Sequence, residues 1–336
     1  MAINPDLNKL LRVRYPILLA AMDLVADARL TLAVSQAGGF GILGGGYGDA
    51  DWLRRELPPL VEGRATRGLQ FGVGFITWSL ARQPHLLDQA LASKPDALWL
   101  SFGDPAPFVD KIKAAGAVLI CQVQTVTMAR DAVALGADIV VAQGAEAGGH
   151  GVSCGAVTLV PAVVDAVGHR VPVVMAGGIG DGRGLAAARM LGAQGVALGT
   201  RFYACQEAGG HPDAKARIVA ASGDDTLRGV VFDISRRNVW PAPFTGRCLR
   251  NDHTHRWEGR ETELMRHIHE EGDRYQAARE RGDFSIAAVI AGEVVGLIRY
   301  VPTAGEIVRR IMAEADDAVD RAVRMHSGAQ SSTQMA

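Results

Sequence analysis

No apolar run in this sequence approaches the ~18 residues that a membrane-spanning helix needs, although 48% of the residues are hydrophobic. The basic first residues precede the apolar stretch PILLAAM, which is too short and too strand-like for a signal sequence. Charge of one sign is also missing, since 35 Lys and Arg stand against 36 Asp and Glu. We therefore expect a cytoplasmic protein that binds neither a membrane nor a nucleic acid.

Cysteine is scarce, and the four residues form no CxxC pair, which argues against a disulfide framework or a zinc site. They are Cys121, Cys154, Cys205 and Cys248. Two HxH pairs, at 253–255 and 267–269, lack the i, i+4 spacing of helical metal ligands, so we predict no metal site. The phosphate-loop motif GxxxxGK[ST] is absent, and the glycine-rich stretch GIGDGRG lacks the GxGxxG spacing.

What is present is a regular alternation of strand-like apolar runs and amphipathic helix patterns. The predicted strands are Pro16–Met22, Phe40–Leu43, Leu69–Phe75, Ala97–Ser101, Val118–Gln122, Ile139–Gln143, Val171–Ala176 and Val196–Leu198. Helices are predicted near Ala28–Gln36, Asp51–Leu57, His85–Leu91, Phe108–Ala114, Thr127–Ala134, Leu159–Val167 and Arg183–Leu191. Eight such units predict an α/β fold, a (β/α)8 TIM barrel. A doubly wound sheet is the alternative, because strand order is invisible in the sequence.

The alternation stops after the eighth strand. Residues 206–283 are polar and charged, and we predict that they form a lid or inserted subdomain over the barrel mouth. The barrel is assigned residues 1–205 together with a C-terminal closing segment, 284–325, which contains an apolar run and an amphipathic helix. The small polar residues 326–336 predict a disordered tail.

The stretch DIVVAQGAEAGGHGVSCG, residues 138–155, carries the strongest chemical signal. A short buried strand runs into a glycine-dense turn, where the backbone can approach a flat or phosphorylated ligand closely. Glu146 and His150 lie in this turn. Barrel enzymes place their chemistry at the C-terminal ends of the strands, so we predict that His150 is catalytic rather than structural. Whether Glu146 orients His150 or is solvated stays open.

Glycines also follow the seventh and eighth predicted strands directly, in VVMAGGIGDGRG at 173–184 and VALGTRF at 196–202. Barrels that bind a phosphate commonly hold it with the loops after these two strands, through backbone N–H groups. The predicted phosphate-binding residues are Gly177, Gly178, Gly199 and Thr200. The alternative is that these glycines only turn the chain.

Three motifs resemble the nitronate monooxygenase family, formerly called 2-nitropropane dioxygenases. They are AQGAEAGGHG at 142–151, MAGGIGDGRGLAAARMLGAQGVALGTRF at 175–202 and PILLAAM at 16–22. The resemblance implies an FMN-dependent TIM barrel that oxidises nitronates or nitroalkanes with oxygen to carbonyl compounds and nitrite. Flavin-dependent enoyl-acyl-carrier-protein reductases and a quinone reductase branch share the same turn and loops. An NAD(P)H-dependent flavin reductase of enoyl thioesters or quinones is therefore the alternative.

The resemblance also implies roles for single residues. Ala21 and Met22 would pack beside the isoalloxazine ring, and Gln122 would face its polar edge. His150 would lie over the ring. The full set of predicted cofactor-binding residues is Ala21, Met22, Gln122, Gly148, Gly149, Gly177, Gly178, Gly199 and Thr200. One position departs from the family pattern FGVN, because this chain has Gly74 where Asn is common.

The expected partners are the small-molecule substrate, a nitronate or nitroalkane, and oxygen. A homodimer is among the assemblies that the sequence allows.

Loops over a rigid scaffold usually carry specificity. The segment 206–298 is therefore expected to shape substrate choice, and three of its aromatic residues should influence which substrate binds. They are Trp240, Phe244 and Trp257.

Overall fold

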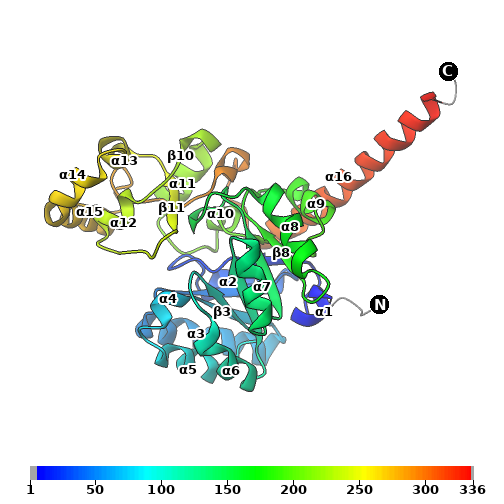
Figure 1. The fold of residues 1–336 in the computed structure, drawn as a ribbon, viewed down its shortest axis with the longest axis horizontal. Coiled ribbons are helices and arrows are strands. Elements are labelled where there is room, and N and C mark those ends of the chain that lie inside the picture. The colour runs from blue at the N-terminus through cyan, green and yellow to red at the C-terminus, as the bar shows by residue number, and fades with distance from the viewer. Residues whose placement is uncertain (1–5, 334–336) are drawn as a thin grey trace.

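The computed structural model describes residues 6–333, and eight parallel strands form its centre (Figure 1). They are β1 (Ile17–Leu19), β2 (Gly41–Gly46), β3 (Phe71–Ile76), β4 (Ala97–Ser101), β5 (Val118–Val123), β6 (Ile139–Gln143), β8 (Val173–Ala176) and β9 (Gly195–Leu198). Neighbours pair in the order β1-β9-β8-β6-β5-β4-β3-β2. The N–H of Leu19 donates to the Phe40 carbonyl, and the N–H of Phe40 donates to the Ile17 carbonyl, both at 2.9 Å. These bonds join the two end strands, so the (β/α)8 barrel is confirmed and the doubly wound sheet is wrong.

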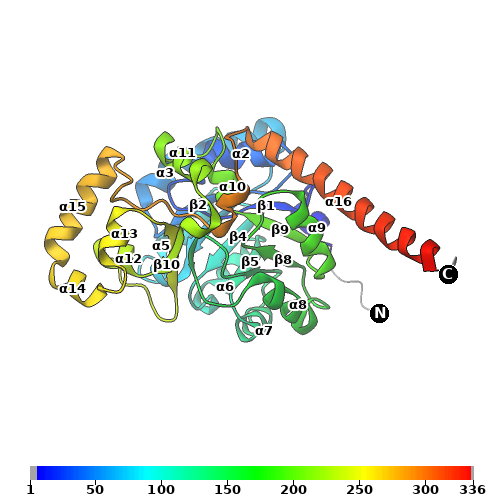
Figure 2. The same ribbon diagram turned by 90° about the horizontal axis from the view of Figure 1, so that it is seen from above.

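Helices between the strands surround the barrel (Figure 2). They are α2 (Ala28–Gln36), α3 (Ala50–Arg67), α5 (His85–Ala92), α6 (Ala106–Ala114), α7 (Val126–Ala134), α8 (Ala156–Val167) and α9 (Gly182–Met190), with the short α4 (Thr77–Leu80) before α5. Helix α3 continues beyond the predicted end at Leu57, because Pro58 and Pro59 lie exposed while Leu57 and Leu60 are buried.

The GxGxxG spacing does occur once, at Gly39–Gly44, but it runs into strand β2 rather than into a strand–turn–helix unit.

Side chains fill the inside of the barrel and leave one end for the site. The interior cluster contains Leu18, Phe40, Ile42, Trp99, Ile120, Ile139, Val141 and Val174. Leu7 and Leu11 of α1 (Leu7–Leu11) belong to the same cluster. A Cβ at Gly195, where β9 begins, would meet the Leu7 side chain at 2.6 Å. Helix α1 therefore covers the N-terminal end of the strands, and the C-terminal end remains for chemistry.

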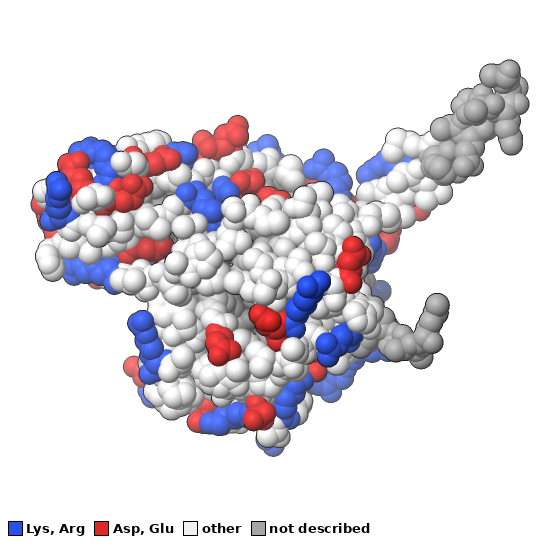
Figure 3. Space-filling model, in the orientation of Figure 1, with Lys and Arg blue, Asp and Glu red and all other residues white. Residues whose placement is uncertain are grey.

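Residues 206–283, which we call the lid segment, follow α10 (Thr200–Tyr203) and form a small α/β unit. Its elements are α11 (Pro212–Ala220), η1 (Gly223–Asp225), β10 (Thr226–Gly229), α12 (Val231–Ser235), β11 (Thr245–Leu249), α13 (Asp252–Trp257), α14 (Glu261–Arg266) and α15 (Ile268–Arg281). Helices α12 to α15 stand to one side of the barrel (Figure 2). Their surface carries many charges, whereas much of the neighbouring barrel face in Figure 3 is uncharged.

The lid segment is joined to the barrel by an antiparallel sheet that the sequence does not reveal. Strand β11 pairs with β10 on one side and with β7 (Gly149–Gly151) on the other. His150 lies opposite Gly246 in this register. Part of the predicted glycine-dense turn is therefore a strand, and its partner lies far along the chain.

The chain then returns to the barrel through η2 (Glu293–Leu297) and the long helix α16 (Ala304–Thr333), which packs against α9 and α2. The far half of α16 extends away from the body (Figures 1 and 2). Its helical residues include 326–333, where a disordered tail is predicted, and residues 334–336 lie outside the described residues. The division into barrel and lid domains stays a prediction. No helix of the described chain is long and apolar enough to cross a membrane.

The interior of the lid segment contains polar groups as well as apolar ones. Trp257 is 2% exposed and packs with Val231 and Leu264, so it lies in the lid core. His253 is equally buried; its Nε2 lies 2.7 Å from the Ser235 hydroxyl, and its Nδ1 has no hydrogen-bond partner in the described residues. Burial lowers the pKa of His253 to about 4.

This buried histidine makes stability depend on pH. Below the ordinary histidine pKa of 6.5 the unfolded chain takes up a proton that the folded lid accepts only near pH 4, so stability decreases as pH falls from about 6.5 to about 4. We expect the urea midpoint of unfolding to decrease as the pH is lowered across this window. His253→Gln should weaken the dependence, whereas His255→Gln, at an exposed position, should leave it unchanged. An identical pH profile for wild type and His253→Gln would contradict this assignment.

Candidate active site

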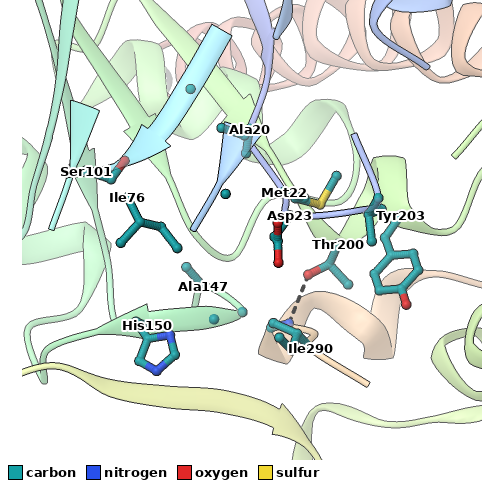
Figure 4. Close-up of a pocket in the computed structure, with 18 of the residues that line it drawn as sticks. Ala20, Met22, Asp23, Ile76, Ser101, Ala147, His150, Thr200, Tyr203 and Ile290 are labelled. Carbon is teal, nitrogen blue, oxygen red and sulfur yellow. Dashed lines mark hydrogen bonds between the residues drawn. The ribbon is translucent and has the colours of Figure 1, made fainter. Parts of the chain in front are cut away.

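A pocket of about 390 Å³ lies at the C-terminal ends of the strands, between the barrel and the lid segment. All the predicted site residues line it. They are His150, Ala21, Met22, Gln122, Gly148, Gly149, Gly177, Gly178, Gly199 and Thr200. Figure 4 shows His150 on one side of this pocket and Thr200 with Met22 on another. The fold thus brings the predicted catalytic and phosphate-binding residues together, and the role of each stays a prediction.

His150 is held by two residues of the lid segment. Its Nε2 lies 2.9 Å from Oδ2 and 3.1 Å from Oδ1 of Asp233, which belongs to α12. The indole ring of Trp240 stacks on the imidazole, with 3.4 Å between ring centroids and 7° between planes. The His150 side chain is only 8% exposed. Of the three aromatic residues expected to influence substrate choice, only Trp240 is among the pocket residues, and Phe244 packs edge-on against Phe102 behind it.

Burial lowers the pKa of His150, although the hydrogen bond and charge of Asp233 act in the opposite direction. Because the net shift is downward, the imidazole is neutral at pH 7. A neutral imidazole can accept a proton.

An amide network below the pocket fixes the backbone of His150. The Gln143 side chain donates to the His150 carbonyl at 3.1 Å and accepts from Gln122 at 2.9 Å and from Gln124 at 2.8 Å. Gln122 therefore lines the pocket while one of its amide hydrogens is already used. The network connects β5 and β6 to β7, so the position of His150 depends on the barrel as well as on the lid segment.

Glu146 is half-buried, and its carboxylate binds a helix N-terminus rather than His150. Its carboxylate accepts the N–H of Ala156, the first residue of α8, at 3.0 and 3.1 Å. A carboxylate at a helix N-terminus satisfies an otherwise unpaired donor and interacts favourably with the helix dipole. Glu146 therefore stabilises the loop that carries His150.

The glycine loops after β8 and β9 fit a phosphate group. Gly177 and Gly178 have φ angles of +101° and +73°, which favour glycine. Within residues 6–333 the backbone N–H groups of Gly178 and Ile179 have no hydrogen-bond acceptor. The Thr200 hydroxyl accepts the Gly292 N–H at 2.9 Å, as Figure 4 shows, and keeps its own hydrogen to donate. Unpaired backbone donors beside a hydroxyl are what a phosphate requires.

The departure at Gly74 has a steric reason. A Cβ at this position would lie 2.3 Å from the Cβ of Ala21, which is closer than any real contact. With Ala21 in place, the Asn of the family pattern would therefore require the backbone at residue 21 or in the third strand to shift. Gly74 itself lines the pocket.

Sequence reasoning missed several polar residues of the pocket. Asp23 points into the space in Figure 4, and burial raises the pKa of its carboxyl group while Arg236 and Arg279 lower it. Tyr47 also lines the pocket and accepts a hydrogen bond from Trp240 Nε1 at 2.9 Å. Asp23 follows Met22 directly, so its position after the first strand could have identified it as a pocket residue. The two arginines come from the lid segment, which has no such pattern.

A (β/α)8 barrel with a histidine and glycine-rich loops at the C-terminal ends of its strands is the arrangement of a barrel enzyme. A family model described as nitronate monooxygenase matches residues 4–70 and 78–314. The chain belongs to the nitronate monooxygenase family, and it is an enzyme.

Individual relatives agree with this placement. A nitronate monooxygenase of Neurospora crassa is 33% identical over 92% of this chain and 91% of its own length. A Rhodococcus jostii protein named an indene-carboxyl-CoA dehydrogenase is 35% identical over 67% of this chain and 62% of its own length.

Solved structures show the same fold. FabK from Thermotoga maritima has a TM-score of 0.83 and 31% identity, covering 95% of this chain and 98% of that chain. Nitroalkane oxidase from Streptomyces ansochromogenes has a TM-score of 0.77 and 26% identity, covering 94% of this chain and 99% of that chain.

Gly148 offers a test of the packing beneath His150. A Cβ here would lie 2.7 Å from backbone atoms of Ala291 and Gly292. Both belong to the closing segment 284–325, which we call the return segment. Gly148→Ala should therefore destabilise the protein by roughly 1–3 kcal/mol, the usual cost of overpacking, as a lower melting temperature. Gly229→Ala is the matched control, because nothing lies within 4 Å of its Cβ position. Equal melting temperatures for the two variants would show that the return segment does not pack closely at Gly148.

Proposed function

We propose that this protein uses FMN to oxidise nitronates or nitroalkanes with oxygen, giving carbonyl compounds and nitrite. One observation supports this most: the predicted flavin-binding residues and His150 line a single pocket in a chain of the nitronate monooxygenase family. The likeness to a nitroalkane oxidase adds support.

The residues present fit FMN. The unpaired backbone donors of Gly178 and Ile179, with the Thr200 hydroxyl, would hold its phosphate. Ala21 and Met22 line the pocket where the ring would pack. Bound FMN supplies the redox chemistry, and the protein supplies placement and charge.

His150 would handle the proton in this reaction. A neutral imidazole can accept the proton from the carbon beside a nitro group, which converts a nitroalkane into its nitronate. A nitronate that enters as the anion needs no such step, and the N–H groups around the site would then orient its oxygens. Trp240 and Phe102 enclose this side of the pocket and exclude water.

An NAD(P)H-dependent reductase of enoyl thioesters or quinones is the second candidate. The Rhodococcus jostii relative named as acting on a CoA thioester favours it. The two candidates share the fold, the flavin and His150, and they differ in where the electrons come from.

The cofactor prediction is direct. We expect the purified protein to be yellow and to release FMN, rather than FAD, on heating, because the glycine loops provide for one phosphate and no second nucleotide motif accompanies them. Chromatography of the released flavin decides between the two. A colourless protein that takes up no added FMN would contradict the flavin assignment.

The turnover prediction separates the two reactions. Without any nicotinamide, the enzyme should consume oxygen and release nitrite from propyl-1-nitronate or 2-nitropropane, and under anaerobic conditions the nitronate should bleach the flavin. As a control, His150→Ala should keep its flavin and lose turnover of 2-nitropropane by roughly 10²–10⁴-fold, the range for removing a positioned base. Rapid bleaching by NADH or NADPH with no response to nitronates would assign the protein to the reductases.

A further inference from the structure

We infer that Asp233 of the lid segment is a positioning residue that fixes the hydrogen of His150 on Nε2, so that Nδ1 is the atom that accepts the substrate proton. Trp240 holds the ring in the plane that this arrangement needs. The inference rests on the proposed function for its kinetic consequence, and the tautomer itself can be measured without any substrate.

The tautomer of His150 follows from the hydrogen bond between its Nε2 and the Asp233 carboxylate. Both carboxylate oxygens of Asp233 lie within hydrogen-bond distance of His150 Nε2, and an ionised carboxylate can only accept. Nε2 must therefore donate. Since the imidazole is neutral, its remaining nitrogen, Nδ1, carries a lone pair. Both polar contacts of the ring with Asp233 are made through Nε2, and His150 lines the substrate pocket whereas Asp233 does not.

Trp240 restricts the imidazole ring from its face. The stacked geometry, 3.4 Å between centroids and 7° between planes, opposes rotation of the imidazole out of its plane toward Trp240. Trp240 is itself fixed, because its Nε1 donates to the Tyr47 hydroxyl at 2.9 Å and Phe102 packs edge-on against it at 5.2 Å. The hydrogen bond between the ring edge and Asp233 and the stacking of Trp240 on the ring face together define one orientation of the imidazole.

Asp233 also stabilises His150 after the imidazole has accepted the substrate proton. As the C–H bond beside the nitro group breaks, its electron pair enters the nitro group and the proton forms a bond to Nδ1. The imidazole then carries a positive charge next to the carboxylate, which stabilises it. Asp233 raises the pKa of His150, whereas the nearby Arg236 and Arg228 lower it. Asp233 is the one acidic group among the charged groups that set this pKa in the described chain.

The lid segment brings Asp233 to His150 through the ladder between β7 and β11. Gly246 lies opposite His150, and the space at its Cβ position lies 3.4 Å from His150 Nε2. The lid segment therefore supplies the group that sets which nitrogen of His150 accepts a proton, although His150 itself belongs to a barrel loop.

The kinetic test compares two forms of one substrate. We expect Asp233→Asn to lower kcat/KM for neutral 2-nitropropane by roughly 10²-fold, a loss of the kind seen when the partner that orients an imidazole is removed. The loss for the preformed nitronate of 2-nitropropane should be less than tenfold, because the nitronate has no proton to give. The acid limb of the nitroalkane profile should move to lower pH, since Asp233 raises the pKa of His150. Asp273→Asn, at an exposed lid carboxylate, is the matched control and should change none of these.

The tautomer test uses the flavin-containing enzyme with nitrogen-15 labelled histidine, and His150→Ala identifies the signal. We expect the hydrogen of His150 on Nε2 in the wild type and a mixture of tautomers in Asp233→Asn. A wild-type hydrogen on Nδ1, or equal losses for the nitroalkane and the nitronate with an unchanged tautomer, would overturn the inference. If the wild type oxidises neither substrate, the proposed function fails while the tautomer measurement still decides the role of Asp233.

Discussion

The antiparallel pairing of β7 with β11 is the interaction on which the site depends. It is short, since β7 spans only Gly149–Gly151, yet it connects a barrel loop to a segment about a hundred residues further along. Backbone hydrogen bonds fix register, so His150 meets Gly246 and its ring reaches Asp233. The amide of Gln143 secures the same strand from the barrel side. Without this pairing His150 would be held from the barrel side alone.

The barrel could be predicted because its signals are local. Short apolar runs, amphipathic helices and glycine stops recur along the chain, and each of the eight predicted strands overlaps an observed one. The glycine loops for which we predict phosphate binding were visible for the same reason, since Gly177 and Gly199 directly follow their strands. Strand closure was not visible, because the bonds between Leu19 and Phe40 depend on strand order.

The contacts around His150 could not be read from the sequence. Asp233 is 83 residues away, and neither it nor Trp240 stands in a motif that pairs with a glycine turn. The role of Glu146 was left open by the sequence, and its carboxylate binds a helix N-terminus ten residues further along the chain. Position within an element can be inferred from a local pattern, but side-chain pairing between elements depends on the packing of the whole molecule.

The close approach of Ala21 and Gly74 couples a position in the loop after β1 to a position in β3. Because the two Cβ atoms would be 2.3 Å apart, a side chain at one position demands its absence at the other, unless the strands separate. Substituting Asn for Gly74 alone should therefore be harmful, whereas the same change made together with Ala21→Gly has room to be accommodated. A side chain at either position therefore restricts which side chain the pocket floor can accept at the other.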